Sequence, residues 1–169
     1  RPLWSEQDPD DWWRATSQAL RDVLQVVPAE QIAAIGLTGQ MHGLTTLDRE
    51  GRPLRPAILW NDQRSGAQCT AITEKVGAKR LYQIIGSILP PGFTAPKLVW
   101  LRENEPQMYA QIARVLLPKD YVRYKLSGAY VMDVADGSGF GAMDIGQRDW
   151  SDEMLAAYDI PRAWLPDLC

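Results

Sequence analysis

The residues best suited to chemistry in this chain of 169 residues lie between two glycines, at positions 39 and 43. Gln40, Met41 and His42 offer an amide, an apolar surface and an imidazole on one short turn. Such a set of side chains is typical of the wall of a ligand pocket. His42 is also the only histidine in the chain. The alternative interpretation is a turn histidine whose polar atoms bond to the backbone.

A second polar group follows about twenty residues later along the chain. Trp60, Asn61 and Asp62 bring an aromatic ring, an amide and a carboxylate together. Sugar recognition needs this combination, because the ring covers the C–H face of a sugar while the other two groups bond its hydroxyls. Each such bond is worth about 1 kcal/mol net, so geometry would supply the discrimination. The alternative is that Asp62 caps the next helix and pairs with Arg64.

Two strands are expected to position these groups. The apolar run at residues 32–37 has the pattern of a strand buried on both faces, and residues 57–60 predict a second strand. Residues 44–60 predict a hairpin-like excursion around the turn at 49–51. Because ligands of open α/β sheets gather at strand ends, we expect residues 40–42 and 60–62 to converge on one rim.

The remaining segments predict an α/β chain rich in helices. Asp8 and Pro9 are an N-cap and a first-turn proline for a helix that Pro28 closes. A short apolar run at 115–117 predicts another strand. Further helices are expected at residues 65–76, 78–85, 97–104, 106–112, 121–126 and 151–158.

Composition excludes several classes of partner. The formal net charge is -3 and no basic stripe exists, which argues against nucleic acid. No apolar run approaches the roughly 20 residues of a membrane span. Cys69 and Cys169 are distant from each other, which favours a reducing, cytoplasmic environment over a disulfide framework. One histidine without paired cysteines also argues against structural zinc. Homodimer formation stays open.

Common catalytic motifs do not fit the chain. Gly137, Gly139, Gly141 and Ala142 have the spacing of a dinucleotide fingerprint, but residues 143–146 are a poor helix start. No phosphate-binding loop is found, and no serine stands in a nucleophile elbow that could use His42. Acidic side chains could meet in space, but nothing singles out a pair. The sequence therefore assigns no catalytic, cofactor-binding or metal-binding residue.

One segment carries a specific family resemblance. Residues 92–104 read Gly-Phe-Thr-Ala-Pro-Lys-Leu-Val-Trp-Leu-Arg-Glu-Asn. This segment resembles the N-terminal signature of the FGGY carbohydrate kinases, whose fixed positions here are Gly92, Thr94, Lys97, Leu98, Trp100, Leu101, Glu103 and Asn104. Residues 38–43, 58–64, 117–121 and 148–151 resemble the xylulokinase branch of that family.

The resemblance implies a fold and an activity. The fold would be the ribonuclease H-like (actin-like ATPase) α/β domain, here incomplete, with a mixed sheet flanked by helices. The reaction would be ATP- and Mg²⁺-dependent phosphorylation of D-xylulose. Met41 and His42 match the family's substrate-contacting pair, and residues 60–62 would rim the sugar site. Lys97 would neutralise an acid or a helix C-terminus, or make a surface ion pair.

Departures from the family pattern set further expectations. No Asp-x-Gly-Thr phosphate-binding hairpin precedes Arg1, and the family's catalytic aspartate and ATP-binding domain lie beyond the last residue here. We therefore expect a piece of a longer kinase, inactive by itself, because phosphoryl transfer depends on those groups. Two alternatives stay open: a kinase for another polyol such as ribulose, gluconate or glycerol, and a non-catalytic interaction scaffold.

Overall fold

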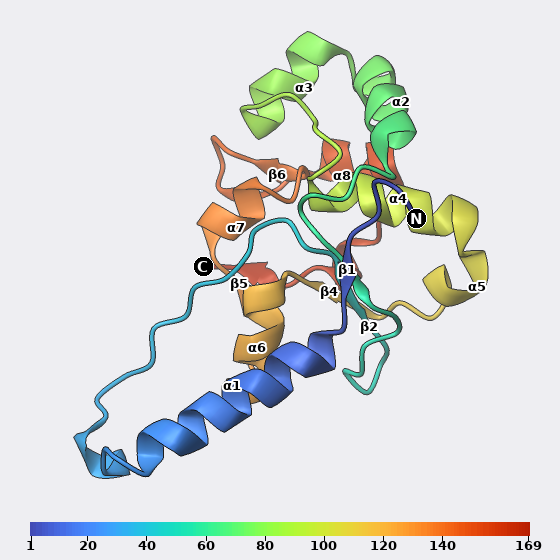
Figure 1. Cartoon of the computed structure of the whole chain (residues 1–169). Helices are drawn as coiled ribbons and strands as arrows, with labels where there is room; N and C mark the ends of the chain where they lie inside the picture. Colours follow the sequence, from blue (N-terminus) through green and yellow to red (C-terminus); the bar gives the residue numbers. More distant parts are fainter.

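The computed structural model describes all of residues 1–169. One long helix, α1, projects from the body of the molecule (Figure 1). The helices are α1 Pro9–Leu24, α2 Gly66–Val76, α3 Ala78–Ile85, α4 Thr94–Asn104, α5 Pro106–Tyr109, α6 Pro118–Ser127, α7 Val134–Ser138 and α8 Asp152–Tyr158, with single 3₁₀ turns at η1 Ala29–Gln31 and η2 Arg162–Trp164. The strands are β1 Glu6–Gln7, β2 Thr45–Leu47, β3 Ala57–Ile58, β4 Arg114–Leu116, β5 Val131–Met132, β6 Met143–Asp144, β7 Asp149–Trp150 and β8 Asp167–Leu168. None of the helices is both long and apolar enough to cross a membrane.

Helix α1 begins as the sequence predicts. The Asp8 side chain accepts a hydrogen bond from the Asp10 N–H at 3.0 Å, and Pro9 occupies the first turn. The first half of the helix packs on α6, where the rings of Trp12 and Tyr121 meet edge to face at 6.5 Å. The Tyr121 hydroxyl also donates to Asp10 at 2.7 Å. The far half of α1 leaves Leu24 half exposed.

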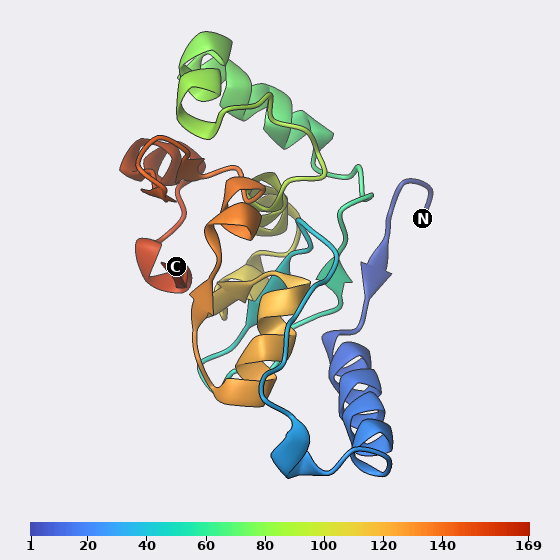
Figure 2. The ribbon, with the colours of Figure 1, turned by 90° about the vertical axis from the view of Figure 1, so that its left-hand side faces the viewer.

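The strand expected at residues 32–37 is not formed, and this prediction is wrong. Residues 33–43 make no backbone–backbone hydrogen bond, and the segment runs extended from η1 back to the body of the molecule (Figures 1 and 2). Ile32 is 37% exposed and Ile35 is 56% exposed, so neither face is buried. A strand exists only when a neighbour receives its N–H and C=O groups, and no strand in residues 1–169 lies alongside this segment.

Short strands nevertheless pair beneath the site. β2 pairs antiparallel with β4, with Thr46 opposite Val115, and β1 pairs antiparallel with β3. A bridge between Leu44 and Ile58 links β3 to the start of β2, which is the hairpin-like excursion that the sequence predicts. β5 and β8 pair in parallel, so the pairing is mixed. The strands predicted at 57–60 and 115–117 are thus confirmed in part.

Helix α4 lies at the centre of the core. It packs between α2 and α8 (Figure 1), and eight successive residues from Thr94 to Leu101 are buried. Leu98 and Leu101 are fully buried within a single cluster of 26 apolar residues. The family signature is therefore mostly a packing element, and its helix α4 begins at Thr94, three residues before the helix that the sequence predicts.

Leu98→Ala should lower the free energy of unfolding by about 2–5 kcal/mol, because it leaves a cavity at a fully buried position. The matched control is Leu24→Ala, since Leu24 is also helical but 49% exposed. Urea denaturation of the three proteins measures the difference. Equal losses at both positions would contradict the central place of α4.

Candidate functional site

The first predicted group lies on the turn that follows the extended segment. Met41 is 47% exposed, whereas His42 is half buried. His42 has a φ of 60°, in the left-handed region that a residue with a Cβ adopts only at a cost. Gln40 points elsewhere, because its amide donates to the Gln7 side chain of β1 at 2.9 Å. A hollow of about 210 Å³ beside Gln40 is lined by none of the other predicted residues.

The first turn of α4 holds His42 in this conformation. The carbonyl oxygen of His42 accepts hydrogen bonds from Lys97 Nζ at 2.9 Å and from the Thr94 hydroxyl at 3.1 Å. The imidazole stacks at a tilt on Phe93, with 4.9 Å between the ring centres. The side chains of Phe93, Thr94 and Lys97, all within the signature, therefore hold His42 in place.

On its other side, the His42 ring lies against Gly139 at the end of α7. A Cβ at position 139 would overlap the imidazole, although Gly139 has an ordinary φ of -83°. Glycine is thus needed for close approach and not for backbone conformation. The Nδ1 atom of His42 lies beside this backbone without a well-formed hydrogen bond.

Burial is the main influence on the protonation of His42. Burial, and next the charge of Lys97, lower the pKa of the imidazole below its ordinary 6.5, while the backbone of Gly139 and, less strongly, the carboxylate of Asp136 raise it. The lowering effects prevail, so His42 is neutral at pH 7. A neutral imidazole can both donate and accept a hydrogen bond, as a hydroxyl ligand requires.

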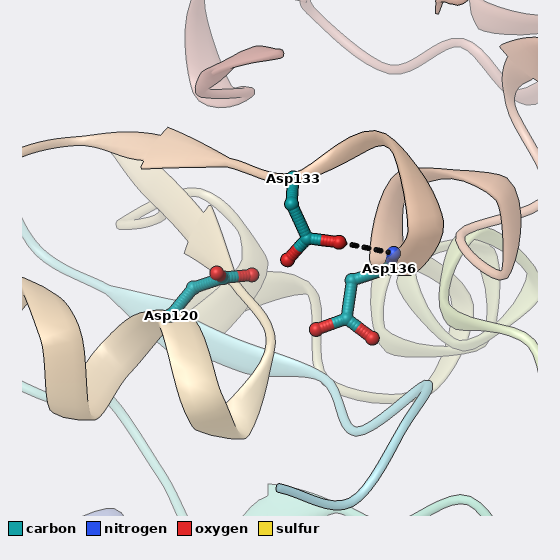
Figure 3. A group of neighbouring side chains, drawn as sticks. All are labelled: Asp120, Asp133 and Asp136. Carbon is teal, nitrogen blue, oxygen red and sulfur yellow. Dashed lines mark hydrogen bonds between the residues drawn. The ribbon is translucent and has the colours of Figure 1, made fainter. Parts of the chain in front are cut away.

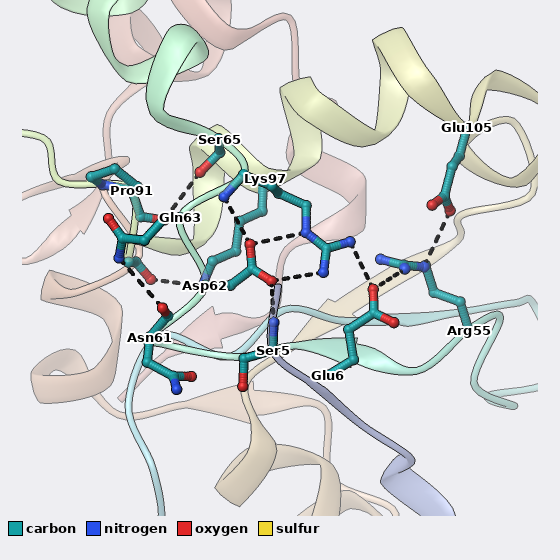
Figure 4. Close-up of polar contacts among 12 residues, drawn as sticks. Ser5, Glu6, Arg55, Asn61, Asp62, Gln63, Ser65, Pro91, Lys97 and Glu105 are labelled. Carbon is teal, nitrogen blue, oxygen red and sulfur yellow. Dashed lines mark hydrogen bonds and ion pairs between the residues drawn. The ribbon is translucent and has the colours of Figure 1, made fainter. Parts of the chain in front are cut away.

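The second predicted group divides into an exposed part and a buried part. Trp60 is 50% exposed and Asn61 is exposed, whereas Asp62 is fully buried. The Asp62 carboxylate accepts from the Ser5 N–H at 2.6 Å and from Arg64 Nη2 at 2.7 Å and Nε at 2.9 Å (Figure 4). Although burial opposes it, these bonds hold the pKa of Asp62 below its ordinary value. Asp62 therefore has no free oxygen for a ligand. The geometry favours its alternative pairing with Arg64 and corrects the assignment of Asp62 to direct contact.

The two groups converge through their backbones. Lys97 Nζ donates to the Gly92 carbonyl at 2.7 Å as well as to His42 (Figure 4 shows the Lys97 end of this contact). Gly92 in turn lies against the Trp60 carbonyl, since a Cβ at position 92 would be 2.6 Å from that oxygen. The His42 turn and the Trp60 turn are thus joined by one lysine and one glycine.

The surface ion pair expected for Lys97 is wrong. Lys97 is fully buried in the first turn of α4 and bonds two carbonyls. Burial lowers the pKa of Lys97 to about 7, with Asp62 raising it and Arg64 lowering it further. The signal was the fixed lysine of the signature, but its burial depends on contacts far apart in the sequence.

An acidic cluster beyond His42 was also missed. Asp120, Asp133 and Asp136 lie together at the start of α6 and around α7 (Figure 3), and their carboxylate oxygens lie within 4.8 Å of one another. The ammonium of Lys119 contacts all three, at 2.7, 2.5 and 3.1 Å. Because the ammonium of Lys119 already occupies the position between the three carboxylates, we assign no Mg²⁺ to these residues.

The sequence of this chain is similar to those of known proteins. Residues 1–169 match the FGGY family of carbohydrate kinases, N-terminal domain. The xylulose kinase of Escherichia coli (strain K12) is 47% identical over 167 residues, which cover 99% of this chain and 34% of that protein. The xylulose kinase of Bacillus subtilis (strain 168) is 40% identical, with coverage of 98% and 33%. The chain therefore spans about a third of the length of the curated relatives it matches.

Solved structures of sugar kinases also resemble this chain in fold. A xyloylose kinase from Brucella ovis superposes with a TM-score of 0.93 at 45% identity, covering 100% of this chain and 35% of that one. A gluconate kinase from Lactobacillus acidophilus superposes with a TM-score of 0.92 at 25% identity, covering 100% and 34%. The predicted fold class, an incomplete actin-like α/β domain, is confirmed.

Gly139→Ala should push the His42 ring out of its place, because the added methyl group overlaps the imidazole. The pKa of His42 should then rise toward 6.5 as the ring becomes solvated. Proton NMR of the only histidine in the chain measures this without ambiguity. Gly36→Ala is the control, since nothing lies within 4 Å of its added Cβ. Unchanged ring resonances in Gly139→Ala would show that the packing is wrong.

Asp62→Asn should lower the free energy of unfolding by about 3 kcal/mol, because it removes the buried one of the two carboxylates that pair with the Arg64 guanidinium and leaves only Glu6. A residue that only contacted a ligand would have no such effect. Asp167→Asn, at a side chain that is 87% exposed, should change stability by less than about 0.5 kcal/mol. Equal stability of both variants and the parent would return Asp62 to the list of ligand contacts.

Proposed function

Since this chain belongs to the FGGY family of carbohydrate kinases, we propose that it is the sugar-binding part of a kinase that converts D-xylulose to D-xylulose 5-phosphate. The relatives named xylulose kinase, at 40–47% identity, support this substrate. In the proposed enzyme, ATP supplies the phosphoryl group and Mg²⁺ neutralises its charge. The residues of this chain bind and orient the sugar.

One observation carries the proposal. The His42 carbonyl is fixed by Lys97 and Thr94, so the exposed Met41 and the half-buried His42 are presented on a rigid turn. Rigid presentation matters because each sugar hydroxyl contributes only about 1 kcal/mol, and a mobile turn would lose that gain to conformational entropy. A second exposed pair, Trp60 and Asn61, stands on the neighbouring turn.

The polar and the apolar side chains of the proposed site contact different parts of the sugar. In this proposal the neutral imidazole of His42 bonds a sugar hydroxyl, and the Asn61 amide bonds another. Met41 and the Trp60 ring cover C–H faces of the sugar, for which apolar and aromatic surfaces are suited. Gln40 contributes by tying the turn to Gln7, and Asp62 contributes by holding Arg64 beneath the Trp60 turn.

Catalysis is proposed to need more than these residues. Phosphoryl transfer requires a base that receives the proton of the attacking hydroxyl and groups that position the phosphates. We assign neither to residues 1–169, because the three carboxylates of the acidic cluster are already engaged by the ammonium of Lys119. The intact protein is therefore proposed as the enzyme, and this chain alone is proposed to be inactive.

The test is a coupled phosphorylation assay of the intact protein that contains residues 1–169. D-Xylulose should be the preferred acceptor over D-ribulose, gluconate and glycerol. His42→Ala should raise the KM for D-xylulose about fivefold and leave the KM for ATP within about twofold, because one oriented hydroxyl bond contributes about 1 kcal/mol. Ile88→Ala, at a side chain that is 76% exposed, is the control.

Other outcomes distinguish the alternatives. Preference for gluconate, ribulose or glycerol would replace the substrate but keep the family activity. Absence of any sugar phosphorylation by the intact protein would favour a non-catalytic scaffold. Turnover by residues 1–169 alone, at the rate of the intact protein, would contradict the proposed inactivity of the isolated chain.

A further inference from the structure

Lys97 has an unusual environment for a lysine. The side chain is fully buried, and its ammonium donates only to two backbone carbonyls, those of His42 and Gly92. A buried ammonium ordinarily needs a carboxylate partner, because its desolvation is costly. The neighbouring carboxylate, Asp62, is instead taken by Arg64 and the Ser5 N–H. Packing alone therefore gives no reason for a charge here, since an apolar side chain would avoid the desolvation.

The two carbonyls indicate what the charge does. One belongs to His42, whose left-handed backbone needs external support. The other belongs to Gly92, which lies directly against the Trp60 carbonyl. Both bonded residues thus belong to, or touch, the turns that carry the proposed ligand contacts. No other side chain bonds both.

We propose that Lys97, assisted by Thr94, is a positioning residue that joins the His42 turn and the Trp60 turn into one sugar-binding site. This inference rests on the proposed function. Lys97 does not touch the sugar: it is sealed beneath the two turns, and it acts through the His42 and Gly92 carbonyls. Thr94 supplies the second bond to the His42 carbonyl, at 3.1 Å.

The positive charge of Lys97 strengthens its hydrogen bonds to the two carbonyls. The ammonium faces Asp62, Arg64 and Cys69, and burial brings its pKa to about 7. Above pH 7 Lys97 therefore loses its proton and becomes a weaker donor to both carbonyls. His42 faces Lys97 and Asp136, of which the lysine lowers and the aspartate raises the pKa of the imidazole. Sugar affinity should consequently fall as the pH rises through 7.

The central experiment is Lys97→Met in the intact protein, which keeps the length of the side chain and removes the charge. The KM for D-xylulose should rise at least tenfold, while the KM for ATP should stay within about twofold. The pH dependence of the sugar KM between pH 6 and 8 should also flatten. Lys75→Met is the matched control, because Lys75 is an exposed lysine that donates to one backbone carbonyl, that of Ala157 at 2.7 Å.

A second readout does not depend on catalysis. NMR titration of the intact protein, with the His42 resonance assigned as the one lost in His42→Ala, should show a higher pKa of His42 in Lys97→Met than in the parent, since the lysine charge lowers it. If the parent does not phosphorylate D-xylulose but this shift appears, the proposed function fails while the positioning stands. If the parent is active and Lys97→Met changes neither the sugar KM nor the His42 pKa, the positioning role is overturned.

A third variant tests the proposal if Lys97→Met does not fold. If circular dichroism shows that Lys97→Met is unfolded, Thr94→Val removes the other donor to the His42 carbonyl with little change of volume. It should raise the sugar KM about two- to fivefold, as expected for one neutral hydrogen bond. A folded Thr94→Val protein with an unchanged sugar KM overturns the proposal.

Discussion

One buried ammonium holds the candidate site together. The bonds from Lys97 to the carbonyls of His42 and Gly92 connect two turns that the Leu44–Ile58 bridge also links below them. The lysine can do this because α4 lies in the middle of the apolar core, where its position is fixed by packing on α2 and α8. Core stability and site geometry therefore depend on the same helix.

The same arrangement places His42 between charges of opposite sign. Lys97 lies on one side of the imidazole and Asp136 acts on it from α7. Asp136 is itself restrained, because Lys119 contacts it at 3.1 Å and the Asp133 carboxylate accepts its N–H at 3.0 Å. The glycine at position 139 then brings the end of α7 close enough for this field to act. The imidazole is thus tuned by two elements that are distant in the sequence.

How far the sequence predicts this structure depends on the range of the interaction. The cap at Asp8 and the ends of α2 and α3 at glycines are local, so they were predicted. The strand at 32–37 was wrong, because apolar composition describes burial that only a pairing neighbour can provide. For Asp62 the sequence left both interpretations open, and only coordinates place Ser5 and Arg64 around its carboxylate.

The proposed ligand contacts stay predictions, whereas the residues that support them were missed by the sequence. Residue types alone pointed to Met41, His42, Trp60 and Asn61, since these side chains are the ones that suit a sugar. Lys97 and Gly139 could not be recognised in the same way, because a buried lysine and a glycine acquire their roles from tertiary contacts. A resemblance to a known signature marked Lys97 as fixed, but it did not say what the lysine holds.

The stacking of Arg64 has a consequence for the first residues of the chain. Its guanidinium lies 3.7 Å above the Trp4 ring and 5.0 Å from the Trp100 ring. The Leu3 and Ser5 carbonyls accept the N–H groups of Gln63 and Leu59, so this short peptide is clamped across both ends of the Trp60 turn. Residues 3–5 are thus held across the Trp60 turn by backbone hydrogen bonds, and Trp4 packs between Arg64 and Trp100 of α4. Loss of these contacts would therefore loosen the Trp60 turn and uncover part of the buried helix at the same time.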